Sequence, residues 1–232
     1  MRRVHGGAGG GREEMNVKKL LLFSICLVAT GACSGSVPEQ LSVIETSNPP
    51  SSVNADLRRE LLALVDEDQK VRLAAMEGDD PALWDTVKAL DKTNTVRMKA
   101  IIEAHGWPGK SLVGEDGTNA AWILIQHGRH DPEFLKRCLI LMEEAVSEGE
   151  AAPQDLAYLI DNVRMLEGRP QLYGTSFTWT PDGTLVPTPI EDEAHVDERR
   201  KAMNLPTMEE YLKAAQEMYL DANLPELGNG TP

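Results

Sequence analysis

The chain has 232 residues, a net charge of −14 at pH 7 and 41% hydrophobic residues. This length suits one domain with appendages, because domains commonly have about 100–200 residues. The apolar content is sufficient for a packed core, so the chain as a whole is not disordered. Its acidic surface would repel phosphate backbones, which excludes nucleic acid as an expected partner.

Residues 15–33 have the pattern of a bacterial secretion signal. Two lysines follow Met15, and a run of mostly apolar residues then leads to Cys33. The run is too short for a membrane-spanning helix, which needs about 20 residues, and its length and flanks are those of a signal peptide. We therefore predict export from a start at Met15, with residues 1–14 as a non-native upstream extension.

The end of this signal resembles the lipobox of bacterial lipoproteins. Gly31 and Ala32 match its small positions, whereas Thr30 stands where leucine is usual. We predict that Cys33 carries a lipid and makes the membrane a partner; the alternative is ordinary cleavage beside a coincidental cysteine. Ser34 is typical of lipoproteins sorted to the outer membrane, so we expect an outer-membrane lipoprotein that faces the periplasm.

Three further segments are predicted after the signal. Residues 34–54 are rich in serine and proline, a composition typical of a linker. Residues 55–222 carry the helical patterns described next and should form the domain. Residues 223–232 are expected to be a flexible tail.

The domain is predicted to be mainly α, a compact arrangement of about six helices. Apolar residues recur at helical spacing over residues 56–76, 81–105, 118–127, 132–145 and 153–166. Asp131 before Pro132 is a strong helix start. The pattern Thr207-x-x-Glu210 is a capping box, which predicts a last helix.

A β-hairpin is predicted near residues 172–186. Aromatic and β-branched residues there flank Pro181-Asp182-Gly183, a turn sequence. Because a two-stranded hairpin is only marginally stable alone, it should lie on the helices.

No strong catalytic signature is present in the sequence, and neither a cofactor nor a metal ion is expected. Phosphate-binding loops, Cys-x-x-Cys, His-Glu-x-x-His and Gly-x-Ser-x-Gly are all absent. His127 and His130 are three residues apart and could share a metal on one helical face. However, Gly128 between them is expected to end the helix.

His127 and Asp161 are the candidate catalytic residues. A histidine that acts as a general base needs an orienting carboxylate, and Asp161 lies in a neighbouring predicted helix. Asp161 stands among apolar residues, where an unpaired carboxylate would be costly. The structural alternative pairs Asp161 with Arg164 or Arg199 as a buried brace.

Five other residues are candidates for ligand binding: Gln171, Tyr173, Thr175, Arg199 and Arg200. The first three surround Gly174 and could line a pocket, or they could attach the hairpin to the helices. The two arginines could bind an anion. They could equally neutralise the acidic run at residues 191–193.

A string of short motifs runs in order through residues 57–212. It consists of Leu57-Arg58-x-Glu60-Leu61, Asp68-Gln69, Gly106-Trp107-Pro108, Val113-Gly114, Gln126-His127, Leu159-x-Asp161, Gly168-x-x-Gln171-x-Tyr173-Gly174-Thr175 and Asp197-x-Arg199-Arg200 with Leu205. Together these motifs resemble a bacterial family designated as domain of unknown function 6624. Asn162 and Ser176 depart from it, because the family usually has arginine and glutamine there. The resemblance implies the extent of the domain but brings no established activity.

The sequence leaves two functions open. The first is a non-enzymatic envelope module, structural or binding a protein, peptide or glycan. The second is a hydrolase in which His127 is the base, Asp161 orients it, and Gln171, Tyr173 and Thr175 hold the substrate. If the second is right, His127, Asp161, Tyr173 and an arginine should converge on an open cleft.

Overall fold

The computed structural model describes residues 53–78 and 80–221, with side-chain detail up to residue 217 in the last helix. The start at Met15, the lipid at Cys33, most of the 34–54 linker and the 223–232 tail lie outside the described residues. These expectations therefore remain predictions.

Seven α-helices and one two-stranded β-hairpin make up the described residues. The elements are α2 (Ala55–Glu77), α3 (Pro81–His105), α4 (Lys110–Gln126), α5 (Pro132–Ser147), α6 (Pro153–Leu166), β1 (Phe177–Trp179), β2 (Leu185–Pro187), the 3-10 turn η1 (Glu193–His195), α7 (Val196–Ala202) and α8 (Met208–Asp221). The predicted fold class, mainly α with a small hairpin, is confirmed. None of these helices is long and apolar enough to cross a membrane.

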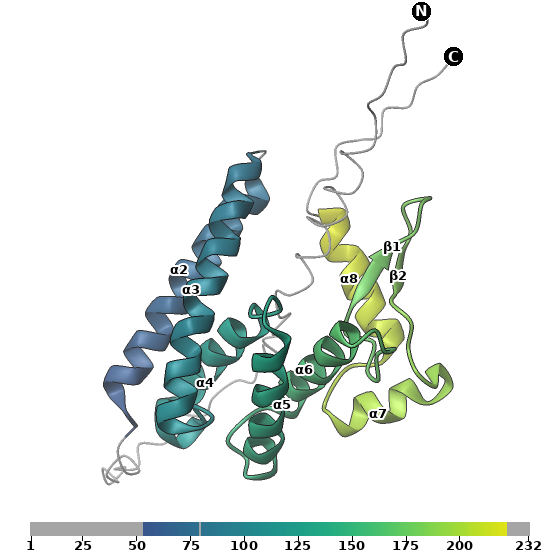
Figure 1. Cartoon of the computed structure of the whole chain (residues 1–232). Coiled ribbons are helices and arrows are strands. Elements are labelled where there is room, and N and C mark those ends of the chain that lie inside the picture. The colour runs from purple at the N-terminus through teal and green to yellow at the C-terminus, as the bar shows by residue number, and fades with distance from the viewer. Residues whose placement is uncertain (1–52, 79, 222–232) are drawn as a thin grey trace, which may run out of the picture.

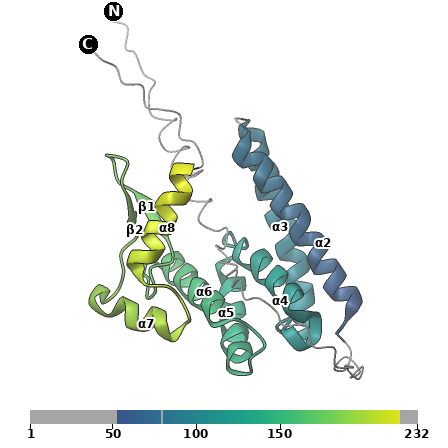
Figure 2. The same ribbon diagram turned by 180° about the vertical axis from the view of Figure 1, so that it is seen from behind.

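The helices form two outer groups, called arms below, with three helices between them. The long helices α2 and α3 form an antiparallel pair on one side, whereas α8, the β-hairpin and α7 lie on the other (Figures 1 and 2). Helices α4, α5 and α6 lie between the arms; α2 packs against both α3 and α4, and α5 packs against α6.

The main hydrophobic core is shared by α2 to α6. Each of these five helices contributes a side chain with no exposed surface: Leu61, Met98, Ile125, Leu135 and Leu159. A second cluster, formed by Phe177, Leu185, Tyr211 and Ala215, packs the hairpin against α8. The predicted docking of the hairpin on a helix is thus confirmed.

The predicted helix starts are present as side-chain caps. The Asp131 carboxylate accepts a hydrogen bond from the Phe134 amide at 3.1 Å, and Pro132 is the first residue of α5. At α8, Glu210 accepts from the Thr207 amide at 2.9 Å, and the Glu210 amide donates to the Thr207 hydroxyl at 3.3 Å. These reciprocal bonds satisfy amides that the first turn of a helix leaves free.

Two helical segments differ from the prediction. Helix α4 begins at Lys110 rather than at 118, with an internal break at Gly114, whose φ of 77° is not helical. Glycine tolerates this left-handed conformation, so the chain can turn and resume the helix. The seven-residue helix α7 was not predicted, because it is too short for apolar periodicity to show.

Candidate functional site

His127 lies in a buried charged cluster, formed with Asp68, Arg72 and Asp91, between α2, α3 and the end of α4. The Nδ1 atom of His127 is 3.0 Å from Oδ2 of Asp68 and 3.1 Å from Nε of Arg72. Arg72 also donates from Nε to Asp68 Oδ2 at 3.1 Å, and its Nη2 pairs with Asp91. Asp68 is 1% exposed and His127 is 8% exposed, so the charges are compensated inside the protein.

The protonation of this charged cluster follows from burial and from Arg72. Burial lowers the pKa of His127, so the ring is neutral near pH 7. Burial alone would raise the pKa of Asp68, but its bonds to His127 and Arg72 outweigh that effect and lower it. Burial raises the pKa of Asp91 to about 6. Because Arg72 Nε has one hydrogen and Asp68 is the stronger acceptor, the Nδ1–H of His127 also donates to Asp68.

The three titratable side chains of the charged cluster have the spacing of a metal site. Asp68, Asp91 and His127 offer ligand atoms within 4.8 Å of one another, a spacing that could hold an ion. However, the guanidinium of Arg72 already bonds both carboxylates and occupies the place of a cation. We therefore assign no metal to the charged cluster.

Two polar side chains on α3 lie close to the charged cluster without a hydrogen-bond partner among the described residues. Asn94 is one helical turn after Asp91, and both polar atoms of its amide are buried and unpartnered. The Thr95 hydroxyl is also unpartnered, and it lies 3.2 Å from where a side chain at Gly128 would begin. Both side chains are 2% exposed, which makes these polar groups costly for stability.

Asp161 holds a different part of the molecule, the loop that follows α6. Its carboxylate accepts hydrogen bonds from the backbone amides of Leu172 (2.7 Å) and Tyr173 (3.2 Å), and from both the amide and the hydroxyl of Thr175 (3.0 Å each). Burial raises the pKa of Asp161, while these bonds oppose the rise. Asp161 has no exposed surface, so it acts as an internal anchor for this loop.

Gln171 joins the same loop to the hairpin. Its side-chain nitrogen donates to the carbonyls of Ser176 and Thr188, both at 3.0 Å, and its oxygen accepts from the Ser176 amide at 2.7 Å. The Gln171 side chain is completely buried. These three bonds go to backbone, and the side-chain nitrogen also donates to the Thr188 hydroxyl, as expected for a side chain that attaches one segment to another.

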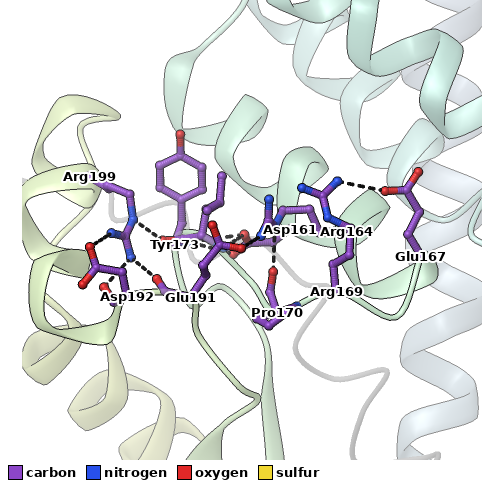
Figure 3. A network of polar contacts seen from close by, with 10 residues as sticks. Asp161, Arg164, Glu167, Arg169, Pro170, Tyr173, Glu191, Asp192 and Arg199 are labelled. Atoms are coloured by element: carbon purple, nitrogen blue, oxygen red, sulfur yellow. Dashed lines mark hydrogen bonds and ion pairs between the residues drawn. The ribbon is translucent and has the colours of Figure 1, made fainter.

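The two candidate arginines also bind backbone. Arg199 donates to the carbonyl of Leu172 at 2.7 Å and to those of residues 191 and 192 at 2.6 and 2.9 Å. Figure 3 shows Arg199 and Asp161 within one polar network on either side of Tyr173. Arg200 donates to the carbonyl of Tyr173 at 2.6 Å, and its guanidinium lies 4.7 Å from the centre of the Tyr211 ring. Arg200 has no exposed surface and is not accessible to an anion in solution.

The structure thus divides the predicted site residues into two groups. Asp161, Gln171, Tyr173, Thr175, Arg199 and Arg200 meet around one loop, and His127 belongs to the charged cluster. No hydrogen bond joins His127 to Asp161 in the described part of the chain; Asp68 is the orienting carboxylate instead. Asp161 forms the expected buried brace, but with backbone amides and Thr175 rather than with Arg164 or Arg199. Arg164 binds the Pro170 carbonyl at 2.6 Å and pairs with Glu191.

A pocket of about 1140 Å³ lies elsewhere, where the starts of α2, α4, α6 and α8 meet. None of the predicted site residues lines it. The polar and aromatic side chains on its walls include Arg58, Lys110, Asn119, Asp155, Tyr158 and Tyr211. The Tyr158 hydroxyl donates to that of Tyr211 at 3.1 Å, and Tyr211 donates to the Thr175 carbonyl at 3.0 Å. The loop anchored by Asp161 therefore helps to position one wall of the pocket.

Charges in the pocket are only partly paired. Arg58 forms a two-bond ion pair with Asp116. Burial raises the pKa of Asp155 to about 7, although the charge of Lys110 lowers it. Among the described residues, neither the Asp155 carboxyl nor the Lys110 ammonium has a hydrogen bond or an ion pair. The partly buried carboxyl of Asp155 and the unpaired ammonium of Lys110 thus line the same pocket.

Sequence reasoning missed this pocket for two reasons. The first turn of α4, which carries Lys110, was not predicted to be helical. Asp155 follows Pro153 closely and reads as an ordinary acidic residue in a first turn, where it favours the helix dipole. No local motif marks either residue, because the pocket is made by four helix starts that are distant in sequence.

Comparison with known proteins identifies a matching family. No curated protein and no solved structure matches the chain significantly. A family model matches residues 55–222, slightly beyond the segment predicted from the motifs. The chain belongs to this family, described as "Family of unknown function (DUF6624)".

Proposed function

We propose that the domain is a ligand-binding module of the bacterial cell envelope, tethered to the outer membrane by a lipid on Cys33. The observation that carries this proposal is the pocket with its unpaired Asp155 and Lys110. Binding sites for small molecules are typically concave and combine apolar or aromatic walls with a few polar groups that fix orientation. Tyr158 and Tyr211 supply the aromatic walls here.

The hydrolase alternative lacks the required convergence. His127 and Asp161 have separate partners, and both are buried with those partners. Neither residue lines the pocket. A general base must reach the substrate while its orienting group holds it in place, so this arrangement favours binding over catalysis.

The proposed tether is compatible with the position of the pocket. Val53, the first described residue, lies on the pocket wall. The 19 residues from 34 to 52 have the composition of a linker, and a linker of that length would reach about 25 Å. A lipid on Cys33 would therefore keep the pocket close to the membrane surface.

The binding proposal is tested with the full chain and a soluble mixture of envelope peptides and glycans. Asn119→Trp places a large ring on the pocket wall, and Val96→Trp adds the same ring at an exposed position of α3 outside the pocket. We expect a retained envelope fragment to be lost with Asn119→Trp and kept with Val96→Trp. Equal retention by both variants, or none by the unaltered chain, would reject the proposal.

The tether is tested by metabolic labelling with a fatty-acid analogue in a bacterial host. We expect the label on the full chain and on Cys138→Ala, whose cysteine is buried in the domain, but not on Cys33→Ala. A chain without label, or a label that persists in Cys33→Ala, would overturn the anchoring.

A further inference from the structure

We propose that the pocket takes a short zwitterionic peptide, with Asp155 receiving its ammonium group and Lys110 its terminal carboxylate. This inference rests on the proposed function, because it specifies the ligand of the same pocket. The pairing of charges in the pocket, the burial of Asp155 and the size of the space support this assignment.

Only some of the charges on the pocket wall are paired with each other. Arg58 and Asp116 bind each other through two hydrogen bonds, so neither is free for a ligand. Asp155 and Lys110 line the same pocket and influence each other electrostatically. In the described structure they nevertheless form no ion pair, which requires a nitrogen and an oxygen within 4.0 Å. A molecule with one cationic and one anionic end can bridge such a separated pair.

Burying the Asp155 carboxyl without a partner costs stability. Burial raises the pKa of this carboxyl to about 7, so the charged form is poorly solvated. A ligand ammonium would replace the missing solvation by a charge-assisted hydrogen bond and favour the ionised carboxylate. Binding should therefore release a proton, and affinity should rise with pH as Asp155 ionises.

Other ionisable groups around Asp155 do not supply this partner. On the neighbouring elements they are Arg58, Lys110, Glu115, Asp116, Glu150, Tyr158 and Tyr211. Glu115 is exposed, and Glu150 accepts a bond from the Ser111 amide at 2.7 Å. The two tyrosine hydroxyls are in the hydrogen-bond chain to Thr175. Among the residues that the structure describes, Lys110 is the cation that remains on the pocket wall, and it is not bonded to Asp155.

The size and the lining of the pocket suit a short peptide. At about 1140 Å³ the pocket is slightly larger than the range of about 300–1,000 Å³ usual for small-molecule sites. A single amino acid would leave most of this space empty, whereas a peptide of a few residues would fill it. The amides of Asn119 and Gln154 and the rings of Tyr158 and Tyr211 are suited to peptide groups and side chains.

The test is calorimetric titration of the full chain in detergent with tri-alanine and its blocked forms. N-acetyl-tri-alanine lacks the ammonium, and tri-alanine amide lacks the carboxylate. We expect tri-alanine to bind and each block to weaken binding about tenfold or more, since each removes one charge-assisted bond. Between about pH 5.5 and 7 the α-amino group stays charged, so affinity should rise as Asp155 ionises.

Two variants assign the ends of the peptide. Asp155→Asn should remove the preference for a free ammonium and flatten the pH dependence, while Lys110→Met should remove the preference for a free carboxylate. Asp85→Asn and Lys88→Met, an exposed ion pair on α3, should leave both preferences intact. Circular dichroism shows whether each variant is folded. If a variant does not fold, the comparison of free and blocked peptides on the unaltered chain still tests the inference.

Three outcomes would overturn the inference. Equal binding of free and blocked peptides would show that the ends are not recognised. In the second outcome, tri-alanine does not bind while an envelope fragment is retained by the unaltered chain and lost in Asn119→Trp. That result would reject a zwitterionic peptide as the ligand and keep the proposed function. If neither the peptide nor any fragment binds, both proposals fail.

Discussion

The Nδ1 atom of His127 lies 3.0 Å from Oδ2 of Asp68, so a carboxylate on α2 fixes the ring at the end of α4. We predict that Asp68→Ala destabilises the protein by about 3–5 kcal/mol, because it leaves the buried Arg72 with one fewer partner. Urea denaturation measures the loss. Asp56→Ala, which breaks an exposed pair with Arg59 on the same helix, should cost less than about 1 kcal/mol. Similar losses in both variants would contradict a structural role for the charged cluster.

Two buried amides should respond in opposite ways to replacement by leucine. Asn94 has no hydrogen-bond partner for either polar atom among the described residues, whereas Gln171 makes three bonds to backbone. Asn94→Leu should leave the free energy of unfolding unchanged or raise it by about 1 kcal/mol. Gln171→Leu should lower it by about 2–4 kcal/mol, since backbone groups of Ser176 and Thr188 lose their partner. A large loss in Asn94→Leu would show that its amide is used.

The carboxylate of Asp161 should be required for the order of the loop after α6. Asp161→Asn replaces one acceptor oxygen by an NH₂ group that faces donors, which should cost about 2–4 kcal/mol. The loop should then be cut faster in limited proteolysis. Thr175→Val removes only one of the four bonds and should cost about 1 kcal/mol. Unchanged proteolysis of Asp161→Asn would exclude the anchoring role.

Asp155 should make stability fall as the pH rises. Its pKa is about 7 in the folded chain against an ordinary 3.8, so the folded state binds the proton more tightly than the unfolded state. The folded state therefore loses stability between about pH 4 and 7 as the carboxyl ionises. Asp155→Asn removes this penalty and should stabilise the protein by about 1 kcal/mol at pH 8, or about 2–4 °C in Tm, with no gain at pH 4.

Asp116→Asn is the matched control for Asp155→Asn. The bond from Arg58 lowers the pKa of Asp116, so its contribution to stability is present above its ordinary pKa and is lost as the pH falls. Its pH dependence should therefore have the opposite sign. The Tm of Asp155→Asn and of the unaltered chain should be compared at each pH from 4 to 8. A difference in Tm that is the same at every pH would rule out the proposed burial of Asp155.

The sequence was most informative where the signal is local. The cap at Asp131 and the capping box of Thr207 and Glu210 act within one helical turn, and both are present as predicted. By contrast, Asp68 could be recognised as part of a motif but not as the partner of His127, because that contact needs α2 and α4 side by side. Asp155 and Lys110 are still harder to predict from the sequence as pocket residues. No short motif contains them, and the pocket forms only where the starts of several helices meet.

A side chain at Gly174 should destabilise the protein through crowding, and this effect can be measured separately from the strain of the backbone conformation. Its φ is 66°, and an added Cβ would lie 2.7 Å from Ile190 Cδ1 and 2.8 Å from Met208 Sδ. Gly149 has a similar φ of 78° but no atom within 4 Å of the added Cβ. Gly149→Ala should therefore cost about 1–2 kcal/mol from left-handed strain alone.

Gly174→Ala should cost about 1–3 kcal/mol more than Gly149→Ala, because overpacking adds to the same strain. Parallel urea denaturation of the two variants measures this difference. Equal losses would mean that Ile190 and Met208 move aside freely and that the junction between the loop and α8 is not tightly packed. A larger loss in Gly174→Ala would show that this glycine permits the loop to pack closely against Ile190 and against Met208, the first residue of α8.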